Sequence, residues 1–120
     1  MINQIENKII NNHKNITVRI VNNSDKKSWD EFVNKYIENS ELCKFYWKDV
    51  LEEKFNASAY FYIAIDETGI ISGIFPAYTN INYKGQINLY TLHKGFYALD
   101  KYSKKLLLKQ IISLASEKKI

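Results

Sequence analysis

The 120-residue sequence contains one cysteine, one proline, four glycines and one arginine. Because Cys43 is alone, no disulfide can form within the chain, and a single thiol fits a reducing compartment. No stretch approaches the ~18 consecutive apolar residues of a membrane span. The first ten residues break every apolar run within two positions, unlike a secretory signal. We therefore expect a cytoplasmic protein without a membrane span.

Arginine is scarce even among the basic residues of the chain. The formal net charge of +4 comes from sixteen lysines and Arg19 alone. Arginine is the preferred side chain for bidentate recognition of phosphates and bases. Lysine in excess beside many asparagines and isoleucines indicates compositional bias, so nucleic acid is not an expected partner. The two histidines and Cys43 lack the spacing of metal ligands, and no metal site is predicted.

The remaining composition is that of a globular chain, with 46% hydrophobic and 25% charged residues. A chain of this length can bury roughly two thirds of its unfolded surface, which is enough for one core. Residues 1–15, rich in asparagine and lysine, are expected to form a flexible tail. Residues 16–120 are expected to form a single domain.

An alternating pattern near the N-terminus predicts the first strand. Residues 16–21 carry apolar side chains at every second position, the period of a strand with one buried face. The side chains on this face are Ile16, Val18 and Ile20.

Two helices are predicted next. The first begins at Ser24 or Asp25, or at a capping box formed by Ser28 and Glu31, and both starts remain open. Its apolar stripe consists of Trp29, Phe32, Val33, Tyr36 and Ile37. The second helix, residues 44–55, has a stripe of Trp47, Val50, Leu51 and Phe55.

Residues 59–92 are rich in β-branched and aromatic side chains and contain two turn signals, at 66–69 and 82–85. Glycine in each turn permits the left-handed backbone of a short hairpin loop, so three antiparallel strands are predicted. The first strand is apolar at nearly every position, which predicts that both its faces are covered. Pro76 removes one main-chain donor and should mark a bulge, a strand crossing or a sheet edge.

A final helix is predicted after an irregular segment, residues 93–99, with Asp100 as its cap. Its buried side is predicted to contain Leu107, Ile111, Leu114 and Ala115. Three further residues, Leu106, Leu108 and Ile112, widen this stripe beyond what one sheet face needs, which implies a partner or further chain. The predicted class is α+β, in the order strand, helix, helix, three-stranded antiparallel meander, helix.

This order is similar to the N-terminal half of the GNAT acyltransferase fold. Residues 28–33, 45–55, 62–66 and 70–77 resemble FemAB-like GNAT proteins in their tryptophans, trailing aromatic residues and Gly-Ile-Phe-Pro ending. The resemblance covers residues 16–120. It implies transfer of acyl or aminoacyl groups to an amine, often on a cell-envelope precursor.

The resemblance also bears on cofactors and partners. GNAT proteins hold acyl-CoA at a Gln/Arg-x-x-Gly-x-Gly/Ala loop before a helix, and residues 93–99 contain one glycine and no such loop. The first repeat of FemAB-like proteins usually lacks this loop too. This chain is therefore expected to bind no cofactor itself and to supply scaffold and acceptor-side surface. The donor, acyl-CoA or an aminoacyl carrier, and a small-molecule or peptide amine acceptor are implied for the complete enzyme. The expected partner is a missing second acyltransferase half or another copy.

No complete catalytic constellation can be recognised, so whether the chain is an enzyme stays open. His93 is the possible base, since histidine exchanges protons near neutral pH. Lys94 is a candidate for contacting a phosphate or carboxylate, and Tyr97 for lining the same cleft. Tyr46 and Trp47 are candidates for the edge of a substrate groove. The alternatives are an exposed loop for the first pair and hydrophobic packing for Trp47 and Tyr97.

A second hypothesis is a non-catalytic binding or assembly module. The broad apolar face of the final helix and an open sheet edge would then pair with another copy or another subunit.

Overall fold

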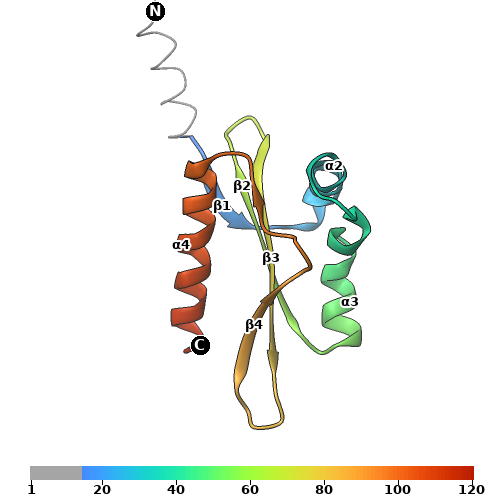
Figure 1. Ribbon diagram of the computed structural model, residues 1–120, viewed down its shortest axis with the longest axis vertical. Helices are drawn as coiled ribbons and strands as arrows, with labels where there is room; N and C mark the ends of the chain where they lie inside the picture. The colour runs from blue at the N-terminus through green and yellow to red at the C-terminus, as the bar shows by residue number, and fades with distance from the viewer. Residues whose placement is uncertain (1–14) are drawn as a thin grey trace, which may run out of the picture.

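The computed structural model describes residues 15–120, so the predicted tail lies almost entirely outside the described residues. An antiparallel sheet forms the middle layer, helices α2 and α3 cover one face, and α4 covers the other (Figure 1). Along the chain the elements are β1 (Thr17–Ile20), η1 (Asn23–Asp25), α2 (Lys26–Tyr36), η2 (Ser40–Cys43), α3 (Trp47–Lys54), β2 (Ser58–Ile65), β3 (Ile71–Ile81), β4 (Ile87–Thr91), β5 (Tyr97–Ala98) and α4 (Lys101–Glu117).

The predicted α+β class and order of elements are confirmed. The strands lie in the order β1-β2-β3-β4, and β5 pairs with β3 beside β4. Every pair is antiparallel. The two-residue strand β5 lies in the segment predicted to be irregular. No helix within residues 15–120 has the length and apolar character needed to cross a membrane.

Strand β2 is the centre of the sheet and is covered on both faces, as its apolar sequence predicted. Phe61 and Ile63 belong to the core beneath α2 and α3, whereas Tyr62 and Ala64 belong to the core beneath α4. All four side chains are buried. A strand with two buried faces loses the polar alternation of a half-exposed strand, which explains its continuous apolar run.

Trp29 is the anchor of the core beneath α2 and α3. Its ring is fully buried, stacks on Phe61 at 5.2 Å between centroids and meets Phe45 edge-on at 6.2 Å. Its indole Nε1–H donates to the Cys43 carbonyl at 2.8 Å. One side chain therefore joins α2, the segment before α3 and β2, and it also satisfies a buried main-chain acceptor.

On the opposite face, a glycine lets α4 approach the sheet. Leu107 and Leu114 are buried against the sheet together with the half-buried Ile111. A Cβ at Gly73 would lie 2.9 Å from Leu107 Cδ1, closer than real Cβ contacts allow. The Gly-Ile-Phe-Pro segment therefore begins with glycine because the close packing of Leu107 leaves no room for a Cβ at position 73.

The first helix starts early. Asn22 and Asp25 form a reciprocal capping box around η1, and α2 continues directly from it. The Arg19 guanidinium donates to both carboxylate oxygens of Asp25, at 2.7 and 2.9 Å. Of the two predicted starts, the one at Ser24 or Asp25 is close to the structure. The start at Ser28 is wrong, because Ser28 lies inside α2.

Two further predictions of burial are wrong. Ile20 shares its predicted face with Ile16 and Val18, but it is 47% exposed, whereas those two are half-buried against the core beneath α4. Phe55 was placed on the stripe of the second helix, but it is 58% exposed. That helix ends at Lys54, so Phe55 occupies the C-cap and departs from the helical face.

Replacing Trp29 by alanine should destabilise the fold by about 3–5 kcal/mol, because the change leaves a large cavity. Trp29→Phe keeps most of the ring but orphans the Cys43 carbonyl, so a smaller loss of about 1–3 kcal/mol is expected. Urea unfolding followed by circular dichroism measures both. Phe55→Ala, at an exposed position, is the control and should cost less than either. Equal losses for Trp29→Ala and Phe55→Ala would contradict the anchoring role.

Stability should fall in acid through Asp25. The hydrogen bonds from Arg19 and, with a smaller effect, the one from the Asn22 N–H hold the pKa of Asp25 below its ordinary value of 3.8, against the opposing effect of burial. A lowered carboxylate pKa stabilises the fold above the ordinary value and loses this contribution as pH falls through the folded-state pKa. Asp25→Asn should therefore flatten the acid limb of a plot of unfolding free energy against pH. The exposed substitution Glu53→Gln should leave that limb in place.

Candidate functional site

The edge strand beside β3 is interrupted at Pro76. Strand β4 pairs with the second half of β3 and β5 with its first half. Between them, the Leu92 N–H donates to the Pro76 carbonyl at 3.0 Å. In an antiparallel pair the N–H and C=O of a residue point to the same side, so the missing N–H of Pro76 faces this edge. The chain leaves the sheet after Leu92 and returns at Tyr97, so Pro76 faces a gap in the edge strand. A bulge, one of the three predicted alternatives, does not occur at Pro76, because the only register shift between β2 and β3 lies at Ala64 and Ile65.

The interrupting loop carries His93 and Lys94, both exposed, followed by the buried Gly95. A Cβ at Gly95 would overlap the Pro76 ring, so only glycine lets the loop lie on the proline. The Gly95 N–H donates to the Leu92 carbonyl at 2.8 Å, and the Cys43 thiol donates to the His93 carbonyl at 3.1 Å. The backbone that carries the two polar side chains is therefore held on both sides.

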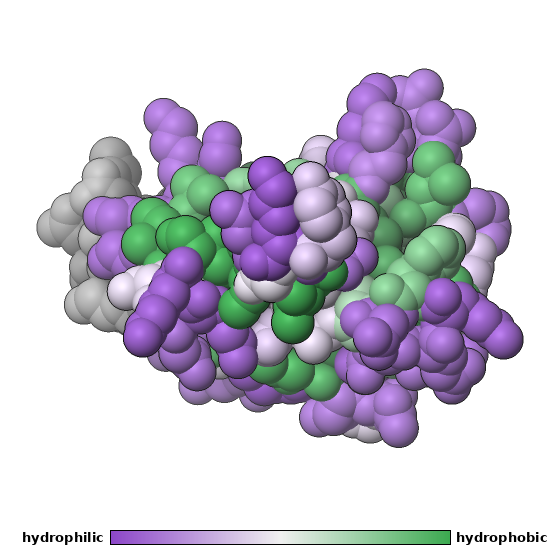
Figure 2. Space-filling model, turned by 90° about the horizontal axis from the view of Figure 1, so that it is seen from below, coloured by the Kyte–Doolittle hydropathy of each residue, from purple (hydrophilic) through white to green (hydrophobic). Residues whose placement is uncertain are grey.

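An aromatic groove opens next to this loop, between α3 and the β3–β4 hairpin. It has a volume of about 340 Å³. Its lining residues are Trp47, Leu51, Phe55, Tyr78, Asn80, Tyr90 and Leu92. Tyr78 and Tyr90 are direct partners across β3 and β4, and their rings stack at 5.4 Å between centroids. Figure 2, viewed from the hairpin end, shows hydrophobic surface between the polar hairpin tip and the flanking elements.

The structure brings together some of the predicted site residues. Trp47 lines the groove, and its indole N–H donates to the Glu41 carbonyl at 2.8 Å. Tyr46 does not line the groove but stacks on Trp47 at 5.6 Å between ring centroids. His93 directly follows Leu92 of the groove lining but is not itself part of that lining.

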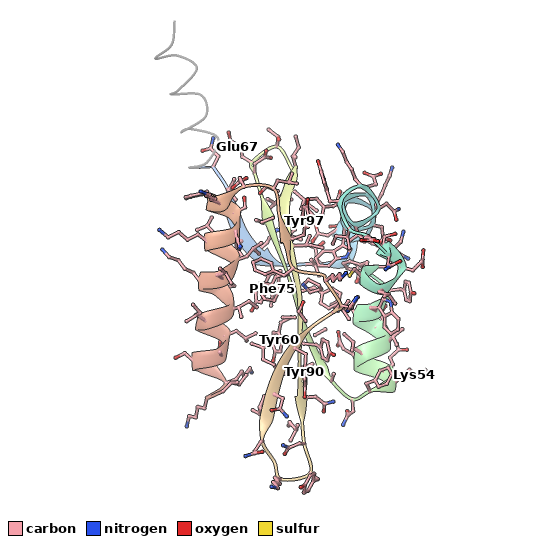
Figure 3. The ribbon with its side chains drawn as sticks, viewed as in Figure 1. Lys54, Tyr60, Glu67, Phe75, Tyr90 and Tyr97 are labelled. Atoms are coloured by element: carbon pink, nitrogen blue, oxygen red, sulfur yellow. The ribbon has the colours of Figure 1, made fainter. Side chains whose placement is uncertain are left out.

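Tyr97 lies apart from the groove. Its ring stacks on Tyr36 at 5.8 Å and meets Phe32 edge-on at 6.2 Å, so it packs against α2 (Figure 3). The neighbouring Phe96 points to the other face and stacks on Phe75 at 4.2 Å. Adjacent residues of an extended segment face opposite sides. The surroundings of Tyr97 therefore agree with the alternative interpretation, hydrophobic packing.

The groove residues on the hairpin were not among the predicted site residues. Tyr78 and Asn80 share one face of β3, and Tyr90 stands opposite Tyr78. The sequence signal is the turn at residues 82–85, and the structure shows its closing pair, in which the Asn82 N–H donates to the Gln86 carbonyl at 2.9 Å. Counting back from that pair places Tyr78 opposite Tyr90. The depth of the groove depends on α3, which no local pattern gives.

The start of α4 is closed by an acidic cap. The Asp100 carboxylate accepts hydrogen bonds from the Ser103 N–H at 2.7 Å and from the Ser103 hydroxyl at 3.2 Å. The buried Ser103 hydroxyl also lies 2.6 Å from the Ser72 hydroxyl. A helix N-terminus attracts anions through its free N–H groups and its dipole. Here a carboxylate already occupies that position and would repel a second negative charge.

The thiol of Cys43 is enclosed. The residue is fully buried, and this burial raises the pKa of the thiol. The Cys43 side chain is therefore a poor nucleophile, because thiolate is the reactive form. Within the part of the chain that the structure describes, no three His, Cys, Asp or Glu residues gather to hold a metal ion.

No family model matches the sequence, and no curated protein matches it. Among solved structures, the chain is similar to a GNAT-family acetyltransferase from Staphylococcus aureus Mu50. The TM-score is 0.59 and the identity is 19%, over 88% of this chain and 68% of that chain. The fold is GNAT-like. In this GNAT-like fold, the aromatic groove and the interrupted edge strand lie side by side, and α4 lies across the sheet from them.

The enclosed thiol gives a direct test of the core around the loop. We expect Cys43 to react with an aromatic disulfide reagent at least about 100-fold more slowly in the native state than in denaturant, since reaction needs an exposed thiolate. Spectrophotometric release of the reagent's thiol measures both rates. Comparable rates in buffer and in denaturant would contradict the burial of the Cys43 thiol beneath the loop.

Proposed function

We propose that this chain is the acceptor-side part of an N-acyltransferase of the FemAB-like kind. The amine acceptor would bind in the aromatic groove, and the acyl or aminoacyl donor would be held outside residues 15–120, in a second acyltransferase half or another subunit. The observation that carries the proposal is the groove itself, which opens beside the interrupted edge strand of a GNAT-like fold.

The groove suits an acceptor with an apolar body and a few polar groups. Its walls combine Trp47, Tyr78 and Tyr90 with the apolar Leu51, and the Asn80 side chain supplies both a donor and an acceptor. Ligand sites of this kind are mostly apolar, with a small number of polar groups that orient the ligand. Flat rings bind small molecules at a low cost in conformational entropy.

The chemistry defines what each partner must supply. The amine nitrogen of the acceptor attacks the carbonyl carbon of the donor, the new amide bond forms, and the carrier leaves with its bonding electrons. The proton lost by the amine passes to a base. His93 is the candidate base, because it is exposed in the loop next to the groove lining. The oxyanion needs main-chain donors, and two of those near the loop, the N–H groups of Leu92 and Gly95, are already bonded.

The acidic cap of α4 supports the assignment of the donor to other chain segments. The pyrophosphate of a CoA-type donor needs free N–H groups and no neighbouring carboxylate at a helix N-terminus. Asp100 uses the Ser103 N–H and brings its own negative charge. This chain then contributes acceptor binding and a base, and the donor site is expected elsewhere.

The proposal predicts binding without turnover. The purified chain should release no thiol from acetyl-CoA in the presence of an amine panel, whereas at least one amine should shift the amide signals of groove residues in ¹H–¹⁵N NMR. Tyr90→Ala should weaken that binding about ten-fold or more, since ring stacking is lost. The matched control is Tyr83→Ala at the hairpin tip, where the ring is 93% exposed and outside the groove.

Two results would contradict the proposal. One is acyl-CoA turnover by the chain alone, which would place a donor site within it. The other is an equal loss of amine binding in the Tyr83 and Tyr90 variants, which would place the amine outside the groove.

The alternative, an assembly module, is favoured by the free edge of β4. Because Leu92 and Gln86 bond toward β3, the alternation of an antiparallel pair leaves the main-chain groups of Ile87, Leu89 and Thr91 pointing outward. Such an edge can pair with another strand. Mass measurement by light scattering separates the cases: a monomer at high concentration argues against pairing between copies.

A further inference from the structure

Helix α4 presents lysines and aliphatic side chains together on its outer side. The residues of this lysine face are Lys101, Lys104, Lys105, Leu108, Lys109 and Ile112, and all six are exposed. At 3.6 residues per turn they fall on one side of the helix, away from the buried Leu107 and Leu114. Figure 3 shows nitrogen-tipped side chains on the outer side of α4, pointing away from the sheet.

The charge of this face is uncompensated within residues 15–120. The sequence of α4 contains four lysines and a single acid, Glu117, which lies on a different side of the helix. The Asp100 carboxylate at the N-cap is bonded to Ser103 and forms no ion pair with these lysines. No ion pair joins the four lysines to an acid in this part of the chain. The face therefore presents positive charge to the surroundings, because its lysines form no ion pairs within residues 15–120.

The aliphatic side chains at the centre of the face narrow the choice of partner. Leu108 and Ile112 stand one turn apart and are 39% and 67% exposed. A partner that only neutralised charge would leave the side chains of Leu108 and Ile112 in contact with water or phosphates, which is unfavourable for apolar groups. Surfaces that bind nucleic acid typically add arginines or aromatic rings for stacking, and this face has neither. An anionic lipid surface matches both features, since it takes up aliphatic side chains below its headgroups and lysine ammonium groups at their level.

We propose that the lysine face of α4 binds peripherally to anionic lipid membranes. The helix would lie along the surface, with Leu108 and Ile112 inserted at the boundary between headgroups and acyl chains and the lysines among the lipid phosphates. The attraction of a lysine close to an anionic leaflet corresponds to about a five-fold gain in binding for each one. The aromatic groove lies beyond the opposite face of the sheet, so a membrane contact would leave it accessible.

Vesicle sedimentation with the full chain tests the proposal. The chain should pellet with vesicles of equal parts phosphatidylcholine and phosphatidylglycerol, remain in solution with phosphatidylcholine alone, and be released as the ionic strength rises to about 1 M. The triple variant Lys104→Gln/Lys105→Gln/Lys109→Gln should bind about 100-fold more weakly. The double variant Leu108→Gln/Ile112→Gln should also bind at least about five-fold more weakly, since its apolar insertion is lost.

A matched control separates the face from the net charge. The variant Lys26→Gln/Lys27→Gln/Lys54→Gln removes the same formal charge from exposed lysines on the other side of the sheet. It should keep binding within about three-fold of the original chain, since its charges lie away from the leaflet. An equal loss in this control would overturn the proposal, because binding would then follow net charge alone.

Insertion gives an independent readout. A fluorophore introduced by Ile112→Trp should shift its emission to the blue on addition of the anionic vesicles, whereas Tyr83→Trp at the hairpin tip should not shift. No shift at position 112 would overturn the apolar part of the proposal. Retention on duplex DNA without any vesicle binding would overturn it altogether and identify the face as a nucleic-acid surface.

Discussion

Pro76 is the constraint on which the arrangement of the site depends. It lies within the longest strand and has no N–H to offer the edge where β4 and β5 run. The edge strand therefore breaks into two pieces, and the loop between them rests on the proline ring through Gly95. Without this break, His93 would belong to a continuous strand and would have no exposed loop beside the groove.

Contacts in the two cores connect the region around Pro76 with the helices on both faces of the sheet. On one face, Trp29 connects α2, β2 and the backbone of Cys43, whose thiol in turn holds the loop at His93. On the other face, Gly73 lets α4 settle against the strand that contains Pro76. The groove and the lysine face thus occupy opposite surfaces of one sheet, which separates the two proposed roles physically.

Much of the fold was accessible from the sequence, because local signals agreed with one another. The glycines in the two turns predicted the meander, and the stripe around Trp29 predicted the buried side of α2. Phe55 failed because its burial depended on where α3 ends, which tertiary contacts decide. Of the candidate site, Trp47 could be found as an aromatic residue on the apolar stripe of the second predicted helix. The groove opposite it could not, because it exists only once α3 has packed against the hairpin.

The long reach of β1 has a consequence for the order of assembly. The pairs β2–β3 and β3–β4 join neighbours in the chain, whereas β1 must cross the whole helical segment to meet β2. Closing a longer loop costs more conformational entropy before the contacts that stabilise the pair can form. The meander is therefore favoured to form early, and the pairing of β1 with β2 is favoured to come later. Until that pairing, the outer edge of β2 stands open, and the newly made chain is most exposed to mispairing with its own copies.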